Sequence, residues 1–296
     1  MPAWIATHGG AAAPAAFSDG CLAAARRGRE MLDAGAPALD AAVAAVRLLE
    51  DDGRFNAGSG SVLRMDGVSI EMDAALMDTR GRLASVAAVY DVKNPILLAL
   101  EVSRTPHVML VGEGAVAFAR KRGFPEHRHM PSERAVRIYR EICAQLRDRD
   151  FSDMPAWEAF DLVANWNFAR GPDDALAACD TVGAVCCDLE GHLAVASSTG
   201  GAAPMLRGRV GDTPIVGSGF FAGEHGAVAA TGLGEEIIRQ TLALRVYERL
   251  AAGLSAQEAC EWGVARFPPA VDVGVIAATR AGTGIASNRD MPRAAL

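Results

Sequence analysis

Residues 180–187 read DTVGAVCC, in which an acidic residue precedes a run of small and β-branched side chains. The run that starts at Thr181 is apolar and predicts a buried β-strand over 181–187. A Glu-Gly turn leads into a second apolar run over 192–198, so the two strands form a predicted hairpin. Residues 168–180 contain Gly and Pro and are typical of a mobile linker. A threonine therefore stands where a linker meets a buried strand.

A threonine at such a junction can serve as a nucleophile once it becomes a chain terminus. Its hydroxyl needs a nearby base, and a free α-amino group with a pKa of about 8 can take the proton. Self-cleavage between Asp180 and Thr181 would fit this plan, with the Asp180 carboxylate as a base or orienting group. Judged on these residues alone, a threonine that merely begins a strand is the commoner explanation.

The rest of the chain alternates between helical and strand patterns. Helices are expected within 18–49 (two, broken near 35–37), 94–103, 112–122, 235–252 and 255–265, and helical segments within 126–178. Strands are expected over 4–7, 69–77, 84–89, 107–111, 227–230, 271–279 and 284–288. This order predicts stacked layers of helix and sheet, an α+β arrangement that the length allows as one large domain over 1–296 or as two ordinary domains.

Composition narrows the function classes. The chain has 296 residues, half of them hydrophobic, and a formal net charge of -7 with no basic cluster, so nucleic acid is not an expected partner. No apolar run reaches the roughly 18 residues of a membrane span, and the N-terminus has no secretory pattern. We expect a cytoplasmic protein with free thiols at its six cysteines. His127 and His129 have a metal-like spacing but are expected to be exposed polar residues.

The junction belongs to a larger set of motifs. Seven more occur in order, at 8–10, 55–61, 73–74, 110–113, 197–201, 208–215 and 231–235. Together they resemble the plant-type L-asparaginase and isoaspartyl peptidase family, part of the glycosylasparaginase superfamily of N-terminal nucleophile hydrolases. The resemblance covers nearly the whole chain.

The resemblance implies a four-layer αββα sandwich of the N-terminal nucleophile hydrolase type. It also implies cleavage into an α chain, 1–180, and a β chain, 181–296, which assemble as a dimer of αβ heterodimers. The implied activity is hydrolysis of L-asparagine to aspartate and ammonia, and of β-aspartyl (isoaspartyl) dipeptides to aspartate and an amino acid.

The resemblance also implies roles for single residues. Thr181 is the implied nucleophile, Thr199 its hydrogen-bond partner, and Thr231 with Gly232 the oxyanion hole. Arg209 and Asp212 suit the α-carboxylate and α-amino groups of an asparagine-like substrate, since a guanidinium grips a carboxylate through two parallel hydrogen bonds.

Gly234 and Asn56 are the other implied substrate-site residues. Gly234 would permit close approach of the backbone to the substrate, and Asn56 belongs to the loop that supports the nucleophile near the substrate pocket. No cofactor is expected for catalysis. A structural sodium ion is implied, held by the backbone carbonyls of Leu49, Glu50, Asp52, Phe55, Ala57 and Ser59.

Two positions depart from the plant-type pattern. Residue 180 is Asp, as in glycosylasparaginases, where the plant-type group usually has Gly, and residue 233 is Leu, where His or Asn is common. The linker before Thr181 also looks short or divergent. A glycosylasparaginase-like amidase therefore stays open as an alternative, as does a non-catalytic ligand-binding relative.

Overall fold

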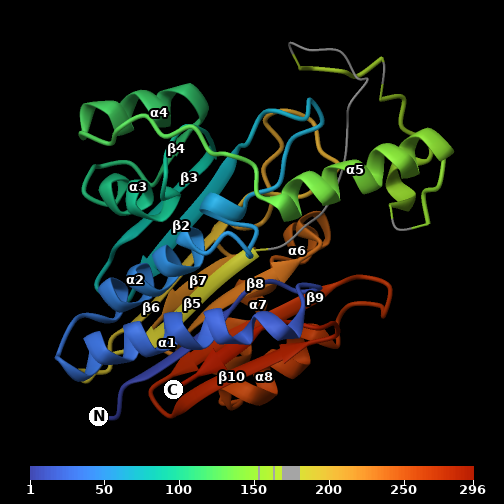
Figure 1. Cartoon of the computed structure of the whole chain (residues 1–296). Coiled ribbons are helices and arrows are strands. Elements are labelled where there is room, and N and C mark those ends of the chain that lie inside the picture. The colour runs from blue at the N-terminus through green and yellow to red at the C-terminus, as the bar shows by residue number, and fades with distance from the viewer. Residues whose placement is uncertain (153, 163, 169–180) are drawn as a thin grey trace.

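The computed structural model describes residues 1–152, 154–162, 164–168 and 181–296, whose helices and strands are arranged as Figure 1 shows. The strands form a seven-stranded sheet in the order β11-β1-β5-β6-β2-β3-β4 and a four-stranded sheet in the order β10-β9-β8-β7. Every pairing in them is antiparallel except β3 with β4. The strands are β1 Trp4–His8, β2 Met72–Asp78, β3 Leu83–Val89, β4 Met109–Val111, β5 Thr181–Cys187, β6 Leu193–Thr199, β7 Phe220–Gly223, β8 Gly226–Gly232, β9 Val273–Thr279, β10 Gly282–Ser287 and β11 Arg293–Ala295.

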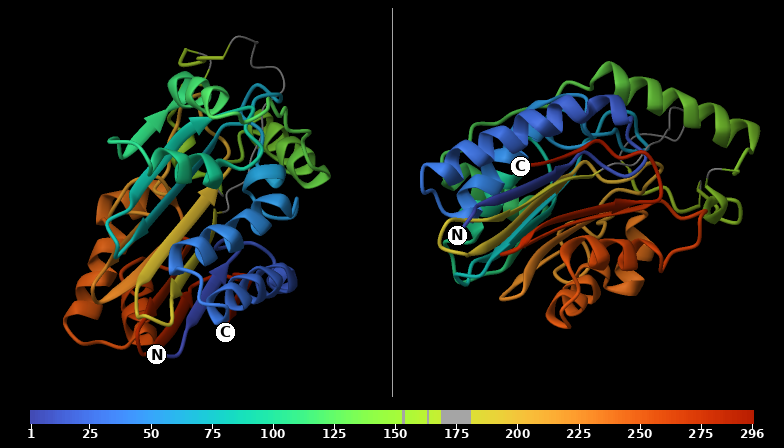
Figure 2. Two further views of the ribbon diagram at one scale, coloured as in Figure 1. Left: turned by 90° about the vertical axis from the view of Figure 1, so that its left-hand side faces the viewer. Right: turned by 90° about the horizontal axis from the view of Figure 1, so that it is seen from below.

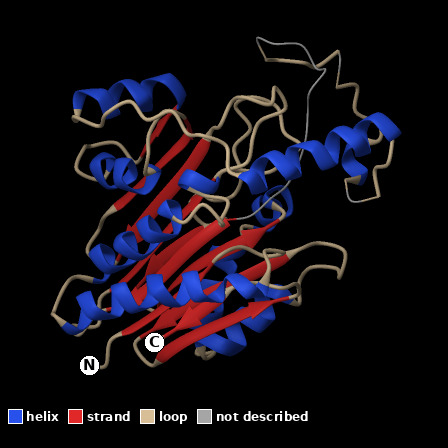
Figure 3. Cartoon of the chain, in the orientation of Figure 1, coloured by secondary structure: helices blue, strands red, loops and turns tan. Residues whose placement is uncertain are grey.

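The helices cover the outer faces of the two sheets (Figures 2 and 3). Helices α1 to α3 pack on the seven-stranded sheet, and α7 and α8 pack on the four-stranded one. Helix α5 projects from the body beside the loops above the sheets (Figure 1). The α-helices are α1 Ser18–Asp33, α2 Ala38–Asp51, α3 Pro95–Val102, α4 Gly112–Lys121, α5 Glu133–Asp148, α6 Gly234–Gln240, α7 Leu242–Ala251 and α8 Ala256–Val264.

The two sheets meet face to face through an apolar core. Val185 and Val195 from the large sheet lie in one buried cluster with Phe220, Ala229 and Ile276 from the small sheet. Alternate residues of β5 point the other way and pack under α1 and α2. Because both faces of this strand are buried, its sequence is apolar throughout instead of alternating. The expected α+β class is confirmed.

The predicted hairpin is confirmed, and its turn is fixed by one side chain. Asp188 Oδ1 accepts hydrogen bonds from the amides of Glu190 and His192 at 3.0 and 2.9 Å. Asp188 Oδ2 accepts another from the Ala38 amide at 3.1 Å, at the start of α2, where a carboxylate also complements the helix dipole. This carboxylate therefore sets the register of the hairpin and the entry of α2 together.

The single helix expected over 235–252 is wrong. The structure has two helices there, α6 and α7, separated by Thr241 in a left-handed conformation with φ of 47°. The amides of Ala243 and Leu244 donate to the carbonyls of Ser218 and Gly217, not to those of α6. Tertiary hydrogen bonds therefore override the local helix preference of this stretch.

Two more features bear on the sequence expectations. The short strand β11, which pairs with β1 at the edge of the large sheet, was not predicted. Among the described residues, no helix combines the length and the apolarity that a membrane span requires. Asp180 and most of the expected linker lie outside the described residues.

Candidate active site

The two threonines expected to act together are neighbours in the large sheet. Thr181 is the first residue of β5 and pairs directly with Thr199, the last residue of β6. Their hydroxyl groups are joined by a hydrogen bond in which Thr181 Oγ1 donates to Thr199 Oγ1 at 3.2 Å. Thr199 Oγ1 also accepts from the Gly201 amide at 3.0 Å. Both threonines are buried, so the hydroxyl of Thr181 is held in one place.

A histidine lies behind this pair on the neighbouring strand. His8, at the end of β1, pairs with Gly183, and its ring lies against that glycine. Burial lowers the pKa of His8 to about 3, and a weaker backbone interaction with Thr181 acts in the opposite direction. His8 is therefore neutral at physiological pH, so it adds no positive charge beside the nucleophile.

Most of the expected substrate residues line one narrow pocket with the two threonines. Its free volume is about 10 Å³, which is room for about one water molecule. The lining residues are Thr181, Thr199, Gly201, Ala202, Arg209, Gly211, Asp212, Thr213, Gly232 and Gly234. Thr231 and Asn56 are not among them.

Arg209 is engaged by an acidic residue that the sequence analysis missed. Its Nε and Nη2 atoms donate to the two carboxylate oxygens of Glu235 at 2.9 and 2.8 Å, the paired geometry expected for a substrate carboxylate. A Cβ at Gly234 would lie only 2.9 Å from Arg209 Nη2, so a side chain there would push the guanidinium away from its present position. Glu235 is the last residue of the 231–235 motif, and that position is the only signal that could have found it.

Asp212 carries a buried carboxylate that faces the same pocket. Burial raises the pKa of Asp212 to about 7, with the positive charge of Arg209 acting against this rise. Its Oδ2 atom is buried and has no hydrogen-bond partner among the described residues. A buried carboxylate without a partner is costly, and an ammonium group is a suitable ligand for it.

Thr231 and Gly232 end strand β8 beside Thr181. Thr231 is fully buried, and its Oγ1 accepts a hydrogen bond from the Ala11 amide at 3.2 Å, which leaves its own hydrogen available to a further acceptor. Gly232 has φ of 136°, and a Cβ there would lie 2.1 Å from the Asp272 carbonyl oxygen. Only glycine fits this conformation. Leu233, the departure noted above, is 40% exposed.

Asn56 supports the pocket from outside. Its Nδ2 donates to the Gly201 carbonyl at 2.7 Å, and its Oδ1 accepts from the Val62 amide at 2.8 Å. Its backbone carbonyl also accepts from the Gly200 amide at 2.9 Å. The structure thus places Asn56 in a loop that contacts the turn following Thr199, near the pocket but not among the residues that line it.

The carbonyls expected to hold sodium lie at the end of α2 and in the loop after it. Helix-end carbonyls lack helical amide donors, and the negative end of the helix dipole favours a cation. Three of the loop carbonyls accept one hydrogen bond each from amides two or three residues further on, which leaves each a second lone pair. The donor chemistry therefore fits a sodium ion. These residues are Leu49, Glu50, Asp52, Phe55, Ala57 and Ser59.

The two histidines with metal-like spacing do not form a metal site. His129 is buried, contrary to expectation, and its Nε2 lies 2.9 Å from the Val92 carbonyl oxygen. The rings of His127 and His129 pack edge to face. Within the described ranges, no group of three or more His, Cys, Asp or Glu side chains could hold a metal ion.

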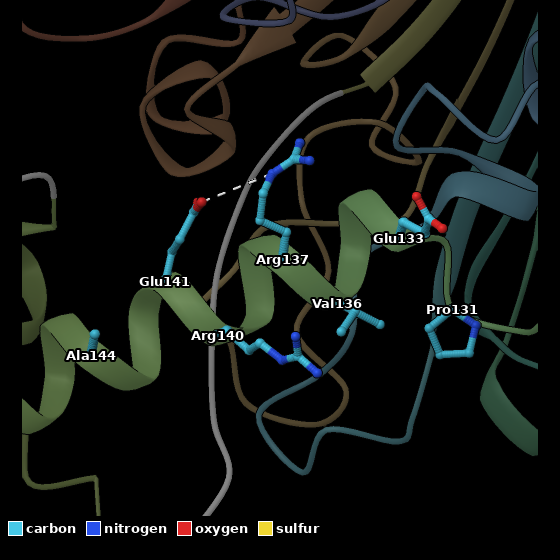
Figure 4. Close-up of a pocket in the computed structure, with 7 residues that line it drawn as sticks. All are labelled: Pro131, Glu133, Val136, Arg137, Arg140, Glu141 and Ala144. Atoms are coloured by element: carbon cyan, nitrogen blue, oxygen red, sulfur yellow. Dashed lines mark ion pairs between the residues drawn. The ribbon is translucent and has the colours of Figure 1, made fainter.

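A larger cavity of about 540 Å³ runs along α5, lined among others by Arg137 and Glu141 (Figure 4). These two residues form an ion pair at 3.9 Å. The cavity contains no hydroxyl or thiol nucleophile among its lining residues, so the pocket at Thr181 is the better candidate for catalysis.

Comparison with known proteins agrees with this site. A family model described as asparaginase matches residues 5–294. The plant-type L-asparaginase of Pyrococcus horikoshii is 42% identical over 227 residues, which cover 75% of this chain and 69% of that protein. The isoaspartyl peptidase/L-asparaginase of Danio rerio is 39% identical, with 89% and 80% covered. The isoaspartyl peptidase of Escherichia coli is 38% identical, with 90% and 83% covered.

Because the matches cover most of the chain, they show that this protein is an enzyme of the amidohydrolase class. The chain belongs to the asparaginase family whose members include plant-type L-asparaginases and isoaspartyl peptidases. The resemblance seen in the sequence motifs is therefore confirmed at the level of the family.

Proposed function

We propose that this protein is a self-cleaving threonine amidohydrolase that acts on L-asparagine and on β-aspartyl dipeptides. The observation that carries the proposal is the buried hydroxyl pair of Thr181 and Thr199, 3.2 Å apart, in one pocket with Arg209 and Asp212. The names of the relatives support the two substrate classes. Both substrates present an amide carbonyl two bonds from a carbon that carries an α-amino and an α-carboxylate group.

The proposal includes a fold type and a processed form. Two facing sheets with helices on their outer faces support the four-layer αββα sandwich of N-terminal nucleophile hydrolases, as one domain over 1–296. The processed form consists of residues 1–180 and 181–296. Its assembly into a dimer of αβ heterodimers and its cytoplasmic location stay predictions from the sequence.

Self-cleavage begins when Thr181 Oγ attacks the carbonyl carbon of residue 180. The peptide bond to the Thr181 nitrogen breaks, an ester to Oγ replaces it, and water hydrolyses that ester. The products are a carboxylate on residue 180 and a free α-amino group on Thr181. The Asp180 carboxylate, which lies outside the described residues, is proposed to act only in this maturation step.

Substrate hydrolysis then uses the new amino group as the base. It takes the Thr181 hydroxyl proton while Oγ attacks the side-chain amide carbon of the substrate. The hydroxyl of Thr231 and the amide of Gly232 donate to the developing oxyanion. Ammonia or an amine leaves with a proton from the Thr181 amino group. Water then hydrolyses the β-aspartyl ester, which releases aspartate and restores Thr181.

Incubation of the purified protein tests both parts of the proposal. A denaturing gel should resolve two fragments, and the smaller should begin with the sequence TVGAVCC, residues 181–187. Release of ammonia from L-asparagine and of aspartate from β-aspartyl dipeptides and from glycosylated asparagine should then be compared. A protein that stays intact and hydrolyses none of these substrates would be a non-catalytic relative, and one selective for glycosylated asparagine would be a different amidase.

The charge of Asp212 should control substrate binding. Only the ionised carboxylate attracts the substrate ammonium, and the pKa of Asp212 is raised to about 7 by burial. KM should therefore rise as the pH falls below about 7, by about tenfold for each further pH unit. Asp212→Asn should have a high KM that lacks this pH dependence. Steady-state KM measured from about pH 5 to about pH 8 checks this; a flat wild-type profile would contradict it.

Arg209 should contribute mainly to recognition of the α-carboxylate. Arg209→Lys keeps the charge but loses the planar fork, which now engages Glu235. A charge-assisted hydrogen bond of this kind contributes about 1.5–3 kcal/mol, so KM should rise roughly tenfold to a hundredfold. Cleavage before Thr181 should proceed normally. Unchanged kinetics in Arg209→Lys would remove this residue from the binding site.

The proposed sodium ion would stabilise the loop after α2 and takes no part in the chemical steps. The carbonyl set from Leu49 to Ser59 supports this by its donor chemistry, as described above. This loop includes Asn56, which contacts the turn after Thr199, so an ion here would act on the pocket only through that turn.

A further inference from the structure

A buried ion pair lies beside the pocket, between its two walls. Arg64 is fully buried in the loop that precedes β2, and the carboxylate of Glu71 is nearly so. Arg64 Nε donates to Glu71 Oε2 at 3.1 Å, and Arg64 Nη2 donates to the Glu71 backbone carbonyl at 2.6 Å. Neither residue lines the pocket, and neither is used in the proposed chemistry.

Each member of the pair also bonds to a different wall of the pocket. Arg64 Nη1 donates to the Gly200 carbonyl at 2.9 Å, directly after Thr199. Glu71 Oε2 accepts from the Gly208 amide at 2.8 Å, directly before Arg209. The pair thus connects the strand end that holds the nucleophile's partner to the loop that holds the proposed substrate contacts.

A role in stability alone does not account for this arrangement. Burying two charges costs desolvation energy that their attraction only partly repays, and well-packed apolar side chains often replace such pairs without loss of stability. What apolar side chains cannot replace are the directional bonds to the Gly200 carbonyl and the Gly208 amide. Those bonds fix two otherwise separate loops relative to each other.

We propose that Arg64 and Glu71 are positioning residues that hold the Arg209–Asp212 loop at its working distance from the Thr181–Thr199 pair. This inference rests on the proposed function, because it assigns the two loops to substrate and nucleophile. Displacement of a bound substrate by about 1 Å can lower the rate a hundredfold. Loss of the pair therefore acts on kcat/KM through the geometry of the pocket.

The test replaces both charges of the ion pair together, so that neither Arg64 nor Glu71 is left buried without the other. Arg64→Met with Glu71→Met is expected to fold and to be cut before Thr181, with a melting temperature close to that of the wild type. Its kcat/KM per cut chain, measured on L-asparagine and a β-aspartyl dipeptide, is expected to fall roughly tenfold to a hundredfold. The matched control is Arg80→Met with Glu190→Met, an exposed pair joined at 2.6 Å, whose kinetics should match the wild type.

If the Arg64–Glu71 pair serves only stability, the double variant should show the opposite result, with an effect on folding and none on the kinetics. The amount of folded, cut protein would fall, while KM and kcat per cut chain would stay at wild-type values, and this result would overturn the inference. If the double variant does not fold, Arg64→Lys decides, because lysine keeps the charge but cannot bond to Gly200 and to both Glu71 oxygens at once. A several-fold fall of kcat/KM per cut chain in Arg64→Lys supports the inference, and a wild-type kcat/KM overturns it.

These outcomes are separate from a failure of the proposed function. In that case the wild type itself would show no hydrolysis that depends on Thr181.

Discussion

Thr181→Ala is expected to remain one uncut chain and to lose hydrolysis of every substrate. The variant lacks the oxygen that attacks residue 180, and without cleavage it never acquires the terminal amino group that serves as the base. Removing a catalytic nucleophile costs on the order of 10⁴-fold or more in kcat, so activity should fall below detection. Because the lost methyl and hydroxyl groups are small, folding should be retained. A denaturing gel and an ammonia-release assay measure the two effects on the same sample.

Thr181→Ser is the matched control, because serine keeps the hydroxyl and loses only the methyl group. It should be cut, more slowly than the wild type, and should hydrolyse substrate at a reduced rate. Cleavage at the same bond in Thr181→Ala, or wild-type turnover by the uncut alanine variant, would show that another residue is the nucleophile.

Thr231→Val should lower kcat by roughly 10²- to 10³-fold with little change in KM. Valine has nearly the shape of threonine but cannot donate a hydrogen bond to an oxyanion, so the loss falls on the transition state. The hydroxyl of Thr231 already accepts from the Ala11 amide at 3.2 Å, which orients it. That amide loses its acceptor in the variant, so the melting temperature should also fall. Turnover must therefore be expressed per cut, folded chain.

The control for this prediction is Thr231→Ser, which restores the hydroxyl. Its kcat should return to within several-fold of the wild-type value. If Thr231→Val turns over substrate within about twofold of the wild type, the amide of Gly232 alone would have to stabilise the oxyanion.

The sequence predicted the hairpin well because its signals are local. The signals are a continuous apolar run from Thr181 and a Glu-Gly turn, both of which lie within the hairpin and depend on few distant residues. The break at Thr241 could not be predicted, because it depends on hydrogen bonds from the residues after it to the carbonyls of Gly217 and Ser218. Those two residues precede β7 and have no sequence pattern that marks them as partners. Strand β11 has only three residues, too few for a period.

In the candidate site, too, residues with a local sequence signal could be predicted and residues without one could not. Residues in distinctive motifs, such as Thr199 and Asp212, were placed in the pocket as expected. Asn56 lies near the pocket, as its motif predicted, but a motif does not tell which way a side chain points, and its contacts to Gly201 and Val62 could not be predicted. Arg64 and Glu71 had no signal, since charged residues beside a turn are usually exposed and nothing local marks them as buried.

The order of strands in the large sheet has a consequence for the cut protein. Strands β5 and β6, from the segment after the proposed cleavage point, lie between β1 and β2, from the segment before it. Neither fragment can leave without breaking three ladders of hydrogen bonds, β11 with β1, β1 with β5 and β6 with β2, and opening the apolar core. The halves should therefore stay associated however far the solution is diluted, and they should melt as one cooperative unit. Cleavage would turn one amide into a carboxylate and an amino group and leave the two fragments in one folded unit.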